Sequence, residues 1–383
     1  MSLKELIVMP AGKDRGGAEE ALLQYVTYRT SQGAPPHVIV LEPGPLTELL
    51  EARGAKVTFI DARRVRDIRR WIETVRKIAA IARQERAQII FGWMSKGHLY
   101  GGIAGLLVNT PAIYYQHGLP EAGTIDRLCR LLPASGALGC SDFVTQQQQR
   151  VVRYPVLSAP PAADISRFEK ARTLSASDLK SRLGFDPNRP LIGIVGRLQR
   201  WKGMHVFAEA MAKIIDTKLD CQGVIVGGPH DWEPDYAVWL EQRVRQLGLT
   251  GKIMLAGKQN NVPVWMQAMD VFVHASEGEP FGIVVVEAMS LGKPVIATKP
   301  GGPEEIIQHG KNGLLIPPND PTKLAEAVVT YLSDPALSAR IGAAARQRAL
   351  EFTPERFAQR VLEALTRFAK PSHLTPSHKD AAG

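Results

Sequence analysis

Cysteine, long apolar runs and metal-ligand spacing are all scarce in this sequence of 383 residues. The three cysteines, Cys129, Cys140 and Cys221, are odd in number and widely separated. This spacing predicts reduced core thiols rather than a disulfide framework or a zinc site. No apolar run approaches the ~20 residues that cross a bilayer, and the N-terminus is too short and too interrupted by charge for a signal peptide. We therefore expect a cytoplasmic protein without a metal site.

Two binding signatures are also missing. The first apolar strand is not followed by G-x-G-x-x-G, so a dinucleotide cofactor is not expected, although Gly16 and Gly17 follow that strand and open a helix. The net charge is +9 and basic residues cluster at Arg63–Arg70, but no aromatic residues interleave with them as in a nucleic-acid module. The cluster is either a solvated helix face or a pad for an anionic acceptor or for anionic lipid at the inner face of a membrane.

Alternating strands and helices are what the sequence does contain. A chain with 45% hydrophobic and 22% charged residues has ordinary globular composition, and its length predicts two domains. Short β-branched runs predict strands at 6–9, 37–41, 56–60, 89–91 and 112–115, and again at 191–195, 223–226, 253–255, 271–274 and 294–297. Helical patterns lie between them, so we expect an α/β protein with two Rossmann-like domains built on parallel sheets.

Composition also suggests where the domains begin and end. Residues 170–189, with Ser175, Ser177, Pro187 and Asn188, resemble a connection, whereas the last residues are polar. The expected parts are an N-terminal domain at 1–170, a linker at 171–189, a C-terminal domain at 190–352, a helix at 353–370 that packs back on the N-terminal domain, and a tail at 371–383.

The most informative segment is Glu279-Pro280-Phe281-Gly282-Ile283-Val284-Val285-Val286-Glu287. Pro and Gly predict a loop that ends at Gly282, and the apolar run from Ile283 predicts a buried helix. The free amides of Gly282, Ile283 and Val284 would favour a phosphate, while the flanking Glu279 and Glu287 would accept hydrogen bonds from sugar hydroxyls. The segment therefore predicts a site for a nucleotide sugar. The alternative is a buried helix with a solvated acidic start.

A basic pair upstream supports the ligand hypothesis. The predicted strand at 191–195 is followed by Gly196-Arg197 and then by Lys202-Gly203. A strand, a glycine-bearing loop and a helix open a βαβ unit, whose ligands bind at the carboxyl end of the strand. Arg197 and Lys202 would reach phosphate oxygens there. We expect both side chains in an open crevice, so that their alanine variants still fold.

With these motifs the sequence resembles glycosyltransferase family 4, the retaining transferases of the GT-B fold. The resemblance is carried by Gly196-Arg197, Lys202-Gly203, Glu279 with Glu287, Gly292–Thr298, Gly301-Gly302 with Glu304–Ile307, and Asn312–Pro317. It is specific over roughly residues 190–350. It is weaker before that, where Gly16–Glu19 and Gln116–Gly118 match and where Pro161-Ala162 stands in place of the common Asn-Gly.

The resemblance implies two facing Rossmann-like domains with a cleft between them. It implies a hexosyltransferase that moves a sugar, with retention, from a nucleotide diphosphate sugar (UDP favoured, GDP also open) to a glycan, lipid-linked sugar or small molecule in polysaccharide or glycoconjugate synthesis. Gly16 and Gly17 would face the donor phosphates and His117 the transferred sugar. The loop of Lys258 would cup the base, and Phe281 would lie in the donor site.

Roles for the remaining residues follow from the chemistry of the bond that breaks. Arg197, Lys202 and the amides after Phe281 would stabilise the departing diphosphate, so that neither a metal nor another cofactor is required. Glu287 would hold the ribose and Glu279 the hexose hydroxyls.

The same motifs are compatible with other classes of protein. A nucleotide-sugar epimerase shares the architecture and the donor, and a non-catalytic nucleotide-sugar-binding scaffold shares the site. An inverting transferase would need a base across the cleft, for which Glu19, Glu121 or His117 could serve. The acceptor cannot be identified from these residues.

Overall fold

The computed structural model describes residues 3–12, 16–62, 66–120 and 123–369. The chain forms two compact units. The first is built from the residues up to Cys140, from Val144–Ala159 and from the part of the chain that starts at Phe357. The second contains Ser141–Phe143 and Pro160–Arg356.

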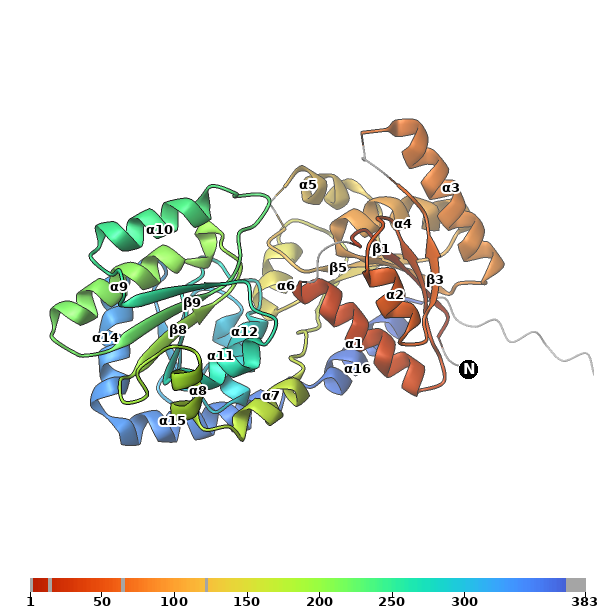
Figure 1. Cartoon of the computed structure of the whole chain (residues 1–383). Helices are drawn as coiled ribbons and strands as arrows, with labels where there is room; N and C mark the ends of the chain where they lie inside the picture. Colours follow the sequence, from red (N-terminus) through yellow and green to blue (C-terminus); the bar gives the residue numbers. More distant parts are fainter. Residues whose placement is uncertain (1–2, 13–15, 63–65, 121–122, 370–383) are drawn as a thin grey trace, which may run out of the picture. The chain divides into compact units, whose positions relative to one another are not determined.

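The first unit is a parallel sheet covered on both faces (Figure 1). Its strands are β1 (Glu5–Met9), β2 (His37–Val40), β3 (Lys56–Phe59), β4 (Ile89–Trp93), β5 (Ala112–Gln116), β6 (Gly136–Gly139) and β7 (Val156–Ser158). Its helices are α1 (Gly17–Ser31), α2 (Leu46–Glu51), α3 (Ile68–Gln84), α4 (Met94–Val108), α5 (Thr124–Leu131) and most of α6 (Asp142–Gln149) and α16 (Pro354–Phe368). The strand order over the described residues is β3-β2-β1-β4-β5-β6-β7.

Burial explains the composition of these strands. α3, α4 and α5 lie side by side on one face of the sheet, and α1, α2 and α16 lie on the other (Figure 1). A parallel sheet covered on both faces favours nearly continuous apolar runs, and β1 and β4 are buried throughout. The order reverses between β1 and β4, which places a switch point at the carboxyl ends of these two strands.

The second unit repeats this plan with the order β10-β9-β8-β11-β12-β13. Its strands are β8 (Leu191–Val195), β9 (Gln222–Val226), β10 (Ile253–Gly257), β11 (Val271–His274), β12 (Val295–Thr298) and β13 (Leu314–Ile316). Its helices are α7 (Ile165–Arg172), α8 (Ala176–Arg182), α9 (Met204–Asp216), α10 (Tyr236–Gln246), α11 (Val262–Ala268), α12 (Ile283–Ser290), α13 (Pro303–Ile306), α14 (Pro321–Ser333) and α15 (Pro335–Ala349). A single 3₁₀ turn, η1, spans Arg200–Lys202.

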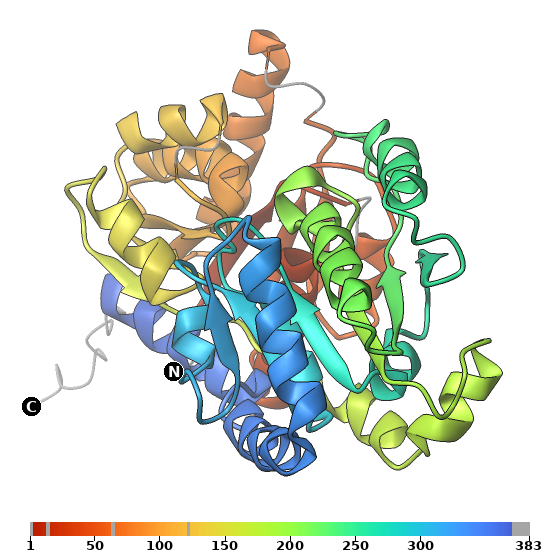
Figure 2. The same cartoon turned by 90° about the vertical axis from the view of Figure 1, so that its left-hand side faces the viewer.

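Two helical layers enclose this second sheet. α9, α10 and α14 cover one face, and Figure 2 looks onto that face, with α9 in light green and α14 in blue before the strands. α8, α11, α12 and α15 form the opposite layer. The switch point lies between β8 and β11, which are paired although residues 196–270 separate them in the chain.

The structure draws the boundary between the units differently from the expected linker at 171–189. That segment carries the end of α7 and all of α8, and the second unit begins at Pro160. Leu179 is buried, and the Lys180 ammonium pairs with Asp270 at 2.6 Å. Because these side chains anchor it, the segment is part of the second unit. α16 is assigned to the first unit from Phe357 onward, and the Phe357 ring packs on Tyr115 there.

Over the described residues, no helix combines the length and the hydropathy that crossing a membrane requires.

Candidate functional site

Two loops at the carboxyl edge of the second sheet hold most of the predicted site residues. One follows β8 and carries Arg197 and Lys202, and the other follows β11 and carries Glu279. Since β8 and β11 are paired at the switch point, the two loops emerge side by side.

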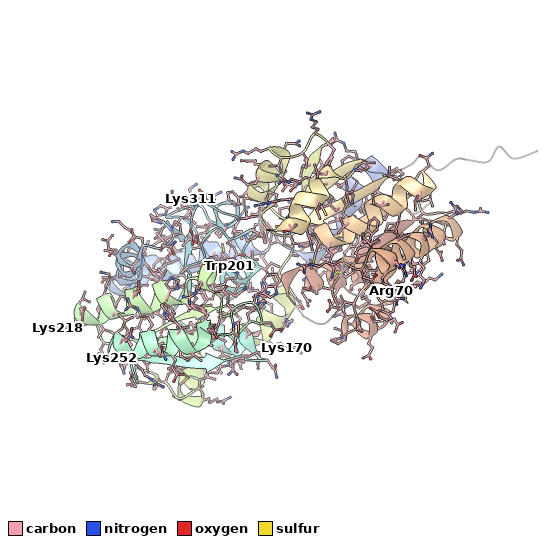
Figure 3. All side chains as sticks on the ribbon, turned by 90° about the horizontal axis from the view of Figure 1, so that it is seen from above. Arg70, Lys170, Trp201, Lys218, Lys252 and Lys311 are labelled. Atoms are coloured by element: carbon pink, nitrogen blue, oxygen red, sulfur yellow. The ribbon has the colours of Figure 1, made fainter. Side chains whose placement is uncertain are left out.

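Glycine and a backbone hydrogen bond lock these loops together. Gly203 has φ +71°, and a Cβ there would lie 2.1 Å from the carbonyl oxygen of Ala275, so only glycine fits. The Glu277 N–H donates to the carbonyl of Trp201 at 2.7 Å. Trp201, labelled in Figure 3, lies on the turn directly before Lys202. This close approach is what brings Lys202 to Glu279.

Lys202 and Glu279 form an ion pair that the sequence did not predict. The Nζ atom of Lys202 lies 2.6 Å from Oε2 of Glu279, and the two side chains are only 15% and 10% exposed. The expectation of an open crevice is therefore wrong for Lys202, because its ammonium neutralises a buried carboxylate. Arg197 fits the expectation: it is exposed, and its Nη1 lies 3.2 Å from Nε2 of His230.

The electrostatics of this pair keep Glu279 ionised. Burial by itself raises the pKa of the Glu279 carboxyl, but the Lys202 ammonium and the hydrogen bond from His274 outweigh it and hold the pKa well below the usual range. A buried carboxylate with a fixed charge is a strong acceptor for hydroxyl donors.

His274 and Ser276 belong to the same cluster, and sequence reasoning missed both. Nε2 of His274 lies 2.9 Å from Oε2 of Glu279 and 3.1 Å from Oγ of Ser276. In the sequence, His274 was only the last residue of a predicted strand. A polar residue that ends a buried strand at the carboxyl edge of a parallel sheet is the signal that could have revealed it.

The helix after this loop begins where the sequence predicted. Gly282 caps α12 with φ +100°, and Ile283 and Val284 form its first turn, whose amides have no acceptor within the helix. Glu287 lies on the next turn and is half-buried. The Phe281 ring is buried against Phe352 at 5.7 Å, so only its backbone is available to a ligand.

Lys258 lies further along the same edge, after β10. The β9 loop separates it from Arg197, and its side chain is exposed. A Cβ added at Gly228 of the β9 loop would lie 3.0 Å from the Cβ of Lys258, so the two loops are in close contact.

The first unit presents Gly16, Gly17 and His117 at the carboxyl edge of its own sheet. Gly16 and Gly17 open α1 after β1, and the amide of Gly16 donates to Oε2 of Glu19 at 2.9 Å. Glu19 therefore caps its own helix. Glu121, the other carboxylate considered as a base, lies outside the described residues.

His117 follows β5 and packs on two aromatic rings. Its ring centroid lies 4.0 Å from that of Tyr115 and 5.5 Å from that of Trp93. Burial lowers the pKa of His117 to about 3, so the ring is neutral at physiological pH. Its Nε2 is buried and has no hydrogen-bond partner among the described residues.

A bound metal ion would be an alternative source of positive charge. The described part of the chain contains no group of three or more His, Cys, Asp or Glu side chains that could hold a metal ion. The positive groups at the switch point of the second unit are Lys202, Arg197 and the first turn of α12.

Comparison with known proteins agrees with this architecture. Residues 176–348 match the family model of glycosyl transferases group 1. The chain is 31% identical over 228 residues to D-inositol 3-phosphate glycosyltransferase of Corynebacterium urealyticum, covering 58% of this chain and 54% of the relative. It is 31% identical over 177 residues to the lipopolysaccharide core biosynthesis mannosyltransferase LpsB of Rhizobium meliloti, covering 45% and 49%. The chain thus spans about half the length of these curated relatives.

A solved structure extends the likeness to nearly the whole chain. Anabaena Alr3699/HepE, crystallised with UDP and glucose, superposes with a TM-score of 0.83 at 28% identity, covering 95% of this chain and 99% of that one. Residues 176–348 match the glycosyl transferases group 1, and the two Rossmann-like units form a GT-B fold. The resemblance to glycosyltransferase family 4 and the fold class predicted from the sequence are confirmed.

Proposed function

We propose that the protein is a retaining, hexosyltransferase-type enzyme that moves a sugar from a nucleotide diphosphate sugar to an acceptor. The observation that carries the proposal is the Lys202–Glu279 pair at the switch point of the second unit. It combines a cation for phosphate with an ionised carboxylate for sugar hydroxyls, 2.6 Å apart. The first turn of α12 adds amide donors beside them.

These groups suit the charges that develop when the bond at the anomeric carbon breaks. The bond electrons leave with the diphosphate, so negative charge grows on its oxygens and positive charge on the sugar ring. Lys202, Arg197 and the amides of Ile283 and Val284 stabilise the departing diphosphate, which is usually the largest catalytic contribution. These groups supply the positive charge that a metal would otherwise bring, so no metal or other cofactor is required.

The sugar and the ribose are held by carboxylates. Glu279 accepts hydrogen bonds from the hexose hydroxyls and Glu287 from the ribose. In the first unit, Gly16 and Gly17 face the donor phosphates, and neutral His117 bonds through Nε2 to the transferred sugar. The loop of Lys258 receives the base. Retention at the anomeric carbon is proposed from the family alone.

UDP is the favoured nucleotide, because HepE was crystallised with UDP and glucose. GDP remains the second choice. The curated relatives are named for an inositol phosphate and for a lipopolysaccharide core. We therefore propose a role in glycolipid, polysaccharide or related glycoconjugate synthesis in the cytoplasm, with a glycan, a lipid-linked sugar or a small molecule as acceptor.

Peripheral contact with an anionic membrane is a further part of the proposal. Arg63, Arg64 and Val65 of the basic cluster lie outside the described residues. Beyond them α3 begins with Ile68 at 62% exposure, next to the exposed Arg69. Arg70, labelled in Figure 3, is instead tied to the backbone of Asp61 at 2.9 Å. An exposed isoleucine among arginines suits the interface of an anionic bilayer.

A two-stage experiment tests the proposed function. A thermal-shift screen of nucleoside diphosphates should single out UDP or GDP, and the matching nucleotide sugars should then be hydrolysed slowly without acceptor. Interconversion of the sugar would show an epimerase instead. Binding without hydrolysis or transfer, across a panel of acceptors, would indicate a scaffold.

A further inference from the structure

His274 is a buried polar side chain that contacts Glu279 and that the proposed mechanism does not use. It ends β11, and only 3% of its surface is exposed. Its Nε2 contacts Oε2 of Glu279 at 2.9 Å and Oγ of Ser276 at 3.1 Å. Oε2 thus accepts hydrogen bonds from both His274 and Lys202, and Oε1 of the same carboxylate is left for a ligand.

The contacts determine which ring nitrogen of His274 carries the hydrogen. The Glu279 carboxylate is ionised and can only accept, so Nε2 must be the donor. Nδ1 is buried and has no hydrogen-bond partner among the described residues. A hydrogen on Nδ1 would therefore be left unsatisfied at a cost. The contacts therefore place the ring hydrogen on Nε2.

Lys202 cannot hold Glu279 alone during the reaction. If Lys202 turns toward the diphosphate of the donor, as the proposed function requires, its ammonium is shared with the phosphate oxygens. His274 has no such second task, because its ring is fixed at the end of a buried strand. Its N–H then maintains the direction of the Glu279 carboxylate.

We propose that His274 is a positioning residue that holds Glu279 Oε2 through its Nε2–H and so directs Oε1 to the hydroxyls of the transferred sugar. This assignment rests on the proposed function. It predicts that substitutions of His274 impair transfer of the sugar and leave the affinity for the nucleotide unchanged.

Two substitutions separate positioning from packing. His274→Leu removes the donor at similar volume, and His274→Gln places an amide N–H near the former Nε2. For the active nucleotide sugar, His274→Leu should lower kcat/KM by about tenfold or more, as expected for a lost hydrogen bond to a charged group. Its Kd for the free nucleoside diphosphate should stay near the wild-type value, and His274→Gln should recover most of the loss.

A matched control uses a histidine elsewhere in the same unit. The ring of His205 bonds to the hydroxyl of Tyr236 at 2.9 Å and takes no part in the Glu279 cluster. His205→Leu should leave turnover nearly unchanged. Full turnover by His274→Leu would overturn the assignment. So would equal impairment of both His274 variants, or a matching loss of nucleotide affinity.

A second measurement does not depend on turnover. In a ¹⁵N-histidine spectrum of the full chain, the signals that vanish in His274→Gln identify His274. We expect a hydrogen on Nε2, with signals that shift in Glu279→Gln. A ring that carries its hydrogen on Nδ1 alone would overturn the assignment even if the enzyme is active. Failure of every nucleotide sugar to react would reject the proposed function while the tautomer still stands.

Discussion

Removing the ammonium of Lys202 should destabilise the second unit more than an active-site substitution usually does. Lys202→Met keeps most of the aliphatic stem but leaves the Glu279 carboxylate, 10% exposed, with the His274 ring as its remaining partner in this cluster. Breaking a buried ion pair on one side costs about 3–5 kcal/mol. Lys311→Met, at an exposed lysine labelled in Figure 3, is the matched control and should stay within about 0.5 kcal/mol.

A double-mutant cycle tests whether the penalty arises from the unpaired charge. Glu279→Gln removes the charge, so Lys202→Met combined with Glu279→Gln should recover about 1–3 kcal/mol relative to the sum of the single changes. Urea unfolding followed by tryptophan emission can measure this, because four of the six tryptophans (Trp201, Trp232, Trp239 and Trp265) lie in the second unit.

The pH dependence has a definite sign. In the wild type, the pKa of Glu279 is depressed from its ordinary value of 4.5, so the pair stabilises the fold fully above that pH. The stabilisation is lost as the pH falls through the depressed pKa. The difference in free energy of unfolding between wild type and Lys202→Met should therefore be largest at neutral pH and should decrease in acid. A Lys202→Met variant as stable as the wild type at pH 7, or strictly additive penalties, would refute this reasoning.

Three further predictions concern the ligands. Arg197→Ala should lower turnover by about 10²-fold, because it removes a donor aimed at developing charge, yet its unfolding curve should match the wild type. In calorimetry with UDP or GDP, Glu287→Gln should weaken nucleoside diphosphate binding, whereas Glu279→Gln should nearly preserve it. The reverse order would contradict the roles proposed for the two carboxylates. Replacing Ile68 and Arg69 by Ser should reduce sedimentation with anionic vesicles, and unchanged binding would remove α3 from the membrane proposal.

The fold followed from the sequence because its strands are short β-branched runs buried on both faces. β8 and β11, for example, were recognisable from 191–195 and 271–274 alone. α8 was missed, because Ala176–Arg182 is short and polar and is fixed by tertiary contacts such as the Lys180–Asp270 pair. Local composition cannot reveal a pairing between residues 90 positions apart in the chain.

The loops of the site were predictable from the sequence, but the contacts between their side chains were not. The Gly282 cap and the start of α12 follow from the Pro-Phe-Gly turn and the apolar run after it. The burial of Lys202 depends on Gly203 touching the backbone of Ala275, a contact between distant segments that no spacing predicts. His274 was overlooked for the same reason, since its partner is known only once the loop after β11 folds back.

Release of nucleoside diphosphate from a nucleotide sugar in the presence of EDTA tests the central claim most directly. If Lys202, Arg197 and the amides of α12 stabilise the leaving diphosphate, wild-type release should persist after chelation, and Arg197→Ala should slow it by about 10²-fold. Release that stops with EDTA and returns only when Mn²⁺ or Mg²⁺ is added back would contradict the account, as would an Arg197→Ala variant with wild-type turnover.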